Sequence, residues 1–69
     1  MSGETVKNKE DLTQIFLKIY TNLPLEERKQ VVIFINDEPI SWELARNEII
    51  HKTFRSEKIL EKLRHLNII

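Results

Sequence analysis

The feature that most constrains the fold is a run of five β-branched or aromatic residues, from Val31 to Ile35. Such side chains lose rotamer freedom on a helix and pack well on a pleated strand. The run has no polar alternation, so both faces of the strand are expected to need an apolar cover. Asn36 to Pro39 has the chemistry of a turn, because Asn and Asp tolerate left-handed backbone geometry. We therefore expect a short hairpin in which Ile40 returns beside Ile35.

The segment before this strand predicts two helices. A helix is expected from Lys9 to about Thr21, with Asn8 as its N-cap, because the apolar residues recur at the spacing of one helical stripe. That stripe consists of Leu12, Ile15, Phe16, Ile19 and Leu23. Pro24 ends the helix, since proline cannot donate the backbone hydrogen bond. A second, short helix is expected from Pro24 to Lys29, capped by Asn22, with acidic residues early and basic residues late.

Two further helices are expected after the hairpin. Ser41 is the strongest local signal in the chain, and it predicts the N-cap of a helix from Trp42 to about Lys52. Residues 53–56 interrupt the pattern, and Ser56 is expected to cap a final helix. The apolar stripe of that helix consists of Ile59, Leu60, Leu63 and Leu66. Asn67 is expected to end it in place of a glycine.

The expected order α-(α)-β-β-α-α is a small α+β fold, in which a short apolar hairpin or ribbon is enclosed by three to four short helices. A chain of 69 residues is enough for one domain. We expect a flexible lead-in over residues 1–7 and a single domain over residues 8–69. No apolar leader follows Met1, and no apolar run approaches the ~18 residues of a membrane span. A cytoplasmic protein without membrane contact is therefore expected.

The composition leaves this domain few ways to stabilise itself. It has no cysteine and one glycine, and a core of this size rarely supplies more than ~3–5 kcal/mol. Trp42, Ala45 and Ile49 share one helical face, while Leu44 projects from roughly the opposite face. With the second face of the strand and the two last isoleucines, this apolar surface predicts a homo-oligomer or a protein partner. The candidate interface residues are Val31, Ile33, Ile35, Trp42, Leu44, Ile68 and Ile69.

These observations favour a non-catalytic protein-interaction or assembly module, which either self-associates or serves as an accessory subunit of a larger intracellular complex. One glycine in 69 residues leaves little room for a concave site and no phosphate-cradling loop. His51 and His65 lack metal-ligand spacing, so no metal, cofactor, catalytic residue or small-molecule substrate is expected. Trp42 is either an interface anchor or a staple of the helix start onto the core, and we favour the staple. Abundant Ile, Lys and Glu with no Cys favour a heat-adapted origin, an interpretation that the five asparagines weaken.

The alternative is a regulator that binds nucleic acid. Residues 42–69 carry six basic and four acidic side chains, while residues 1–41 carry five basic and seven acidic ones. Helix, break and helix are similar to a helix-turn-helix, and the strand, the helix and Arg55-Ser56 together resemble ribbon–helix–helix repressors. The resemblance implies nucleic-acid contacts from Lys52, Arg55, Lys58, Lys62 and Arg64. A base-reading strand needs alternating polar side chains, however, and this strand is wholly apolar.

Overall fold

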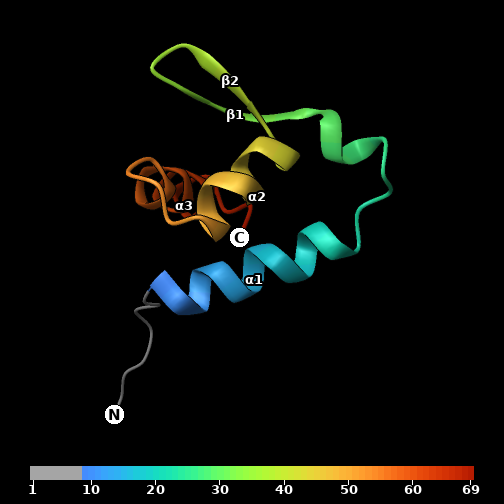
Figure 1. The fold of residues 1–69 in the computed structure, drawn as a ribbon, viewed down its shortest axis with the longest axis horizontal. Coiled ribbons are helices and arrows are strands. Elements are labelled where there is room, and N and C mark those ends of the chain that lie inside the picture. The colour runs from blue at the N-terminus through green and yellow to red at the C-terminus, as the bar shows by residue number, and fades with distance from the viewer. Residues whose placement is uncertain (1–8) are drawn as a thin grey trace.

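The computed structural model describes residues 9–69, so the predicted lead-in and the predicted cap Asn8 lie outside the described residues. In this part of the chain the elements are α1 (Lys9–Thr21), the 3₁₀-helix η1 (Glu27–Lys29), β1 (Val31–Ile35), β2 (Glu38–Ser41), α2 (Trp42–Ile50) and α3 (Ser56–His65). The predicted α+β fold is confirmed. Helix α2 packs on α1, α3 and β2, and it lies between α1 and the hairpin (Figure 1).

The hairpin turns within two residues rather than the four that were predicted. Asn36 and Asp37 have φ values of 50° and 69°, and positive φ at both positions matches the right-handed twist of the flanking strands. Because the turn is this short, Ile40 pairs with Ile33 and not with Ile35. The predicted pairing of Ile40 was therefore wrong by two positions.

Only one face of the hairpin is covered, which corrects the prediction of a cover on both faces. Ile33 and Ile35 on the inner face are buried, whereas Phe34 between them on the outer face is exposed. Val31 is also exposed, and it lies beyond a register shift in the pairing between Val31 and Ile33. Phe34 lies opposite Pro39, next to the hydrogen-bonded pair that closes the turn. In that register the proline nitrogen faces away from β1, so the ladder loses no hydrogen bond.

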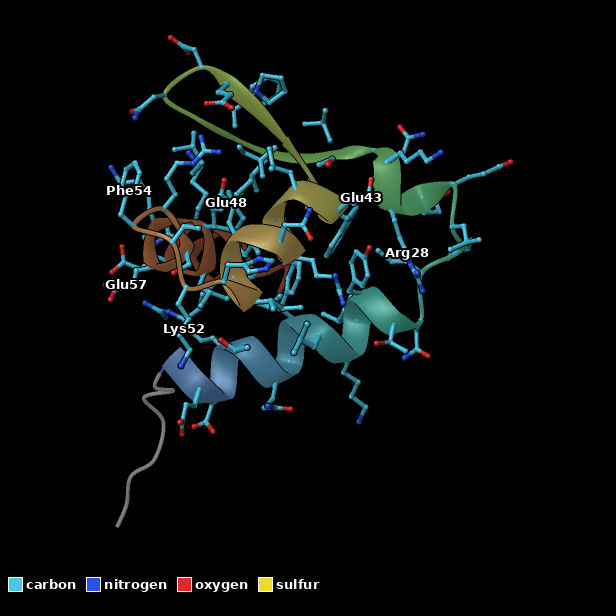
Figure 2. The ribbon with its side chains drawn as sticks, in the orientation of Figure 1. Arg28, Glu43, Glu48, Lys52, Phe54 and Glu57 are labelled. Carbon is cyan, nitrogen blue, oxygen red and sulfur yellow. The ribbon has the colours of Figure 1, made fainter. Side chains whose placement is uncertain are left out.

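Helix α1 has the predicted bounds, but the segment after it differs. Asn22 caps no second helix, because its amide donates to the Lys18 carbonyl (3.0 Å) at the end of α1. Only Glu27–Lys29 is helical, as a single 3₁₀ turn. Arg28 reaches from η1 to the end of α1, where its guanidinium donates to the carbonyls of Leu23 and Thr21 (both 3.2 Å; Figure 2). Of the last four carbonyls of α1, those of Lys18 and Thr21 accept from these side chains, and those of Ile19 and Tyr20 accept from the amides that follow the helix.

Helix α2 begins as predicted, with the Leu44 amide donating to Ser41 Oγ (3.0 Å). It ends at Ile50, two residues before the predicted Lys52. Leu44 does not stand on an open face, because it is half-buried against the core.

Helix α3 differs from prediction at its start. Ser56 is its first residue rather than its cap, and its hydroxyl donates back to the Thr53 carbonyl (2.8 Å). At the other end Asn67 has a φ of 61°. The Ile68 amide donates to the Leu63 carbonyl (2.9 Å), as in a Schellman motif. The predicted role of Asn67 is confirmed, whereas Leu66 is exposed and does not belong to the buried stripe.

The core lies where the three α-helices meet the inner face of the hairpin. Phe16 stacks between Tyr20 and Trp42, with ring centroids 6.2 and 5.7 Å away. The half-buried Trp42 therefore staples the start of α2 onto the core. The buried apolar residues are Leu12, Phe16, Tyr20, Ile33, Ile35, Ile40, Ala45, Ile49, Ile59, Leu60 and Leu63. Of the helices described, none is long and apolar enough to cross a membrane.

Candidate functional site

The most exposed large apolar side chain in the described residues is Phe54, which lies between α2 and α3 and is 93% exposed. The other exposed large apolar side chains are Leu25, Val31, Phe34, Ile50 and Leu66. Large aromatic side chains that stand in solvent are enriched at binding sites, because burial on a partner removes them from water. The surroundings of Phe54 therefore define the candidate site.

The backbone before Phe54 is held by a second Schellman motif, at the end of α2. Lys52 is left-handed (φ 52°) and its amide donates to the Ile49 carbonyl (3.2 Å). The Thr53 amide donates to the Glu48 carbonyl (3.1 Å). These two bonds reverse the chain and satisfy the last carbonyls of the helix. The direction in which Phe54 leaves α2 is therefore fixed by the backbone.

A polar clamp, defined by Glu38, Glu48, Thr53 and Arg55, fixes the same loop through its side chains. The Glu48 carboxylate accepts a short hydrogen bond from the Thr53 hydroxyl and another from the Arg55 guanidinium (2.8 Å). The second arm of the guanidinium donates to Glu38 Oε1 on β2 (2.7 Å). Arg55, at the start of α3, therefore joins the hairpin to α2. The residues of the polar clamp lie on both sides of Phe54 in the sequence.

The clamp shifts the protonation equilibria of its charged members. The pKa of Glu48 is lowered from its ordinary value, first by the hydrogen bond from Thr53 and then by that from Arg55. The pKa of Arg55 is raised, first by the hydrogen bond to Glu48 and then by that to Glu38. Both shifts favour the charged forms, because these hydrogen bonds are made by the ions.

The clamp predicts that the loop loosens in acid. Because the folded-state pKa of Glu48 is lowered, the stability that its charge contributes is complete above the ordinary value of 4.5 and is lost as the pH falls through the folded value. We expect the backbone chemical shifts of Thr53 and Ser56 to change with the midpoint of the Glu48 carboxyl signal. NMR titration measures both, and Glu48→Gln should abolish the transition. Loop shifts that stay constant while Glu48 titrates would contradict the clamp.

Beside Phe54 lies a cleft of about 910 Å³. It is bounded by the stretch of α1 from Glu10 to Leu17, the end of α2, the loop and the first half of α3, and Phe54 itself forms part of its wall. Its apolar walls include Leu17, Ile50 and Leu60. Its charged lining consists of Glu10, Asp11, Lys52 and Glu57. Figure 2 shows Lys52, Phe54 and Glu57 along the same side of the molecule.

The predicted interface residues are dispersed rather than gathered at this cleft. Val31 is exposed on the hairpin, but Ile33 and Ile35 belong to the core. Four more are half-buried and pack against the core: Trp42, Leu44, Ile68 and Ile69. Of the predicted set, Val31 therefore contributes the most accessible apolar surface.

The residues predicted for nucleic-acid contact are divided as well. Arg55 is bound by two carboxylates, and Lys52 lies at the cleft. Lys58, Lys62 and Arg64 are exposed on α3, with Glu61 among them. One feature that carried the resemblance to ribbon–helix–helix repressors also differs, since Ser56 is the first residue of α3 and makes no cap.

The sequence prediction missed Phe54 and Ile50, which it placed in an interruption and at the end of a helix. The only local sign of the site was an aromatic residue within a helix break. Among the described residues, no three His, Cys, Asp or Glu side chains gather as metal ligands do. Comparison with protein-family models, with curated proteins and with solved structures finds no match to this chain.

Proposed function

We propose that this protein is a non-catalytic protein-interaction module and that Phe54 is the anchor of its binding surface. The observation that carries the proposal is the 93% exposure of Phe54 on a loop fixed by the polar clamp. An exposed aromatic ring has most of its apolar surface still to bury, and a pre-organised loop loses little conformational entropy when a partner binds. Exposure and order together favour a binding role over a solvated loop.

The titratable groups of the site support binding rather than catalysis. Glu48 and Arg55 have shifted pKa values, but each is hydrogen-bonded to the other. General acid–base chemistry needs a group that can exchange its proton with a substrate. The clamp instead keeps both groups charged, which suits a structural role in positioning the loop.

The nucleic-acid alternative has less support from the arrangement of charges. Binding to the phosphates of a nucleic acid requires cationic side chains that are available to displace its counterions. Arg55 is already ion-paired with both Glu38 and Glu48, and Glu61 lies among the lysines of α3. We therefore place the binding surface at Phe54 rather than on α3.

Phe54→Ser tests this function with Leu25→Ser as the matched control, because Leu25 is also exposed but lies far along the chain, before η1. Protein partners are first captured from the cells that make the chain, and the affinity of each purified partner is then measured. Wild type and Leu25→Ser are expected to bind equally. Phe54→Ser is expected to bind at least about 10-fold more weakly, as for a hot-spot residue. Equal affinity of all three chains for every partner, including a second copy, would refute the proposed function.

A further inference from the structure

We propose that two copies of this chain join through the outer edge of β1, where their β1 strands pair antiparallel about a two-fold axis. The pair forms a four-stranded sheet in the order β2-β1-β1-β2. This edge is separate from Phe54 and from the cleft beside it. The inference therefore goes beyond the proposed function and does not depend on it.

The outer edge of β1 is open in the part of the chain that the structure describes. The sheet has two strands, so β1 has a strand on one side only. Phe34 lies opposite Pro39, next to the hydrogen-bonded pair that closes the turn, so the amide and carbonyl of Phe34 face away from β2. Outside the ladder of the hairpin, the backbone hydrogen bonds of the described residues include none from residues 31–35. The amide and carbonyl of Phe34 are therefore available to another strand.

β1 lacks the features that protect an edge strand. Charged side chains and proline commonly prevent the edges of sheets from pairing, and the five residues of β1 include neither. β2 has both, in Glu38 and Pro39. A register shift between Val31 and Ile33 interrupts the ladder near the start of β1. We therefore place the contact at the regular end of the strand, on Phe34.

The charges on either side of β1 favour a second copy as the partner. Lys29 lies two residues before the strand and Asp37 two residues after it, and both are exposed. Neither belongs to an ion pair of the described chain. The next charged residues are already held, Arg28 by carbonyls at the end of α1 and Glu38 by Arg55.

The direction of pairing follows from these two charges. When two copies of β1 run antiparallel, the start of each strand lies beside the end of the other. Lys29 of each copy then lies near Asp37 of the other, whereas a parallel pair would bring like charges together. The strand therefore carries opposite charges at its two ends, and this arrangement matches an identical strand in the antiparallel direction.

The two-fold axis is placed beside Phe34. When Phe34 of one copy lies opposite Phe34 of the other, each amide donates to the other carbonyl, as in the hydrogen-bonded pair of an antiparallel ladder. The two rings project from the same face of the new sheet, where directly opposed aromatic side chains interact. That face is the open one, on which Phe34 is exposed, so pairing also removes apolar surface from water. Each copy makes the same contacts as the other, and the contact closes as a dimer.

Sedimentation velocity from about 1 µM to about 1 mM, a range that covers weak and moderate dissociation constants, tests the dimer. Wild type is expected to show a concentration-dependent monomer–dimer equilibrium. Phe34→Ser is expected to raise the dissociation constant at least about 5-fold, because the opposed rings are lost. Phe54→Ser is the control, since Phe54 is also exposed but lies away from β1, and it should leave the constant unchanged. Circular dichroism confirms that each variant is folded.

Two charge variants test the antiparallel direction. Lys29→Glu and Asp37→Asn should each weaken the dimer a few-fold, because two exposed ion pairs are lost. In a Lys29→Glu chain, however, Asp37→Asn removes a repulsion and should strengthen the dimer. Within one chain the two positions are separated by the five residues of β1, about 17 Å of strand. That distance exceeds the Debye length of about 8 Å at physiological salt, so a reversed effect of Asp37→Asn reports a contact between copies.

Hydrogen exchange tests the backbone contact itself. The Phe34 amide should exchange several-fold more slowly at about 1 mM than at about 20 µM, because only the dimer supplies its acceptor. The Leu25 amide, on an exposed residue before η1, is the control and should exchange equally at both concentrations. NMR resolves the two amides in one experiment.

The outcomes separate this inference from the proposed function. A wild-type chain that stays monomeric to about 1 mM overturns the pairing of β1 strands. A dimer in which the Phe34 amide gains no protection, or in which Asp37→Asn weakens the Lys29→Glu chain further, overturns it as well. If the β1 dimer forms but Phe54→Ser binds every captured partner as wild type does, the proposed function falls and this inference stands.

Discussion

Replacing Phe16 by alanine is expected to unfold most of the chain at 25 °C. Phe16 has no exposed surface and stacks on both Tyr20 and Trp42, so its removal leaves a cavity between α1 and α2. A buried Phe→Ala change costs ~3–5 kcal/mol. A domain this small and without disulfides rarely has more than ~3–5 kcal/mol of net stability. The substitution therefore removes most or all of the stability.

The matched control is Phe54→Ala, which deletes the same atoms from a ring that is 93% exposed. We expect it to change the free energy of unfolding by less than about 0.5 kcal/mol. Both variants are compared by urea denaturation followed by far-UV circular dichroism, at a low concentration that suppresses self-association. A cooperative transition for Phe16→Ala at the wild-type midpoint would show that the aromatic stack is not the centre of the core.

Ile40→Ala is expected to be the next most damaging change, at ~2–5 kcal/mol. Ile40 has no exposed surface and lies opposite the buried Ile33. It therefore anchors the inner face of the hairpin to the helices. Its loss should release the hairpin, and with it the carboxylate of Glu38 that holds one arm of Arg55.

Phe34→Ala serves as the control for Ile40→Ala, because Phe34 occupies the open face of the same hairpin and is 56% exposed. It should cost less than about 0.5 kcal/mol. Urea denaturation gives both values, and NMR of Thr53 and Ser56 reports whether the clamp survives. Equal losses of unfolding free energy in the two variants would mean that both faces of the hairpin contribute equally to stability. That result would contradict the burial of Ile40 and the exposure of Phe34.

The elements that were predicted correctly are those specified by residues close in sequence. The bounds of α1, the apolar run of β1 and the cap at Ser41 each depend on a few neighbouring residues, and all three are found at the predicted positions. Of the predicted stripe of α1, only Leu12 and Phe16 are buried, and Tyr20, outside that stripe, is buried with them. The end of α2 was predicted two residues too late, because nothing local marks a lysine for the left-handed position that Lys52 occupies. Glycine is the usual residue there.

The candidate site depended on distant contacts and was largely missed. The side chain of Arg55 is held by Glu38, 17 residues away in sequence, and hydrophobic pattern contains no information about that pairing. The predicted interface was instead chosen by apolar character, which placed Ile33 and Ile35 in it although they form part of the core. Their burial follows from the hairpin register, which was predicted incorrectly at Ile40.

Pro39 blocks the pairing of a further strand with the outer edge of β2. A fibril of stacked hairpins requires each molecule to accept a new strand on both outer edges. The outer edge of β2 presents a proline nitrogen opposite Phe34, and that atom has no hydrogen to donate. A strand from another molecule can therefore pair only with the outer edge of β1. A second copy that pairs there through its own β1 leaves only blocked β2 edges, so the apolar run of β1 cannot drive the growth of a fibril.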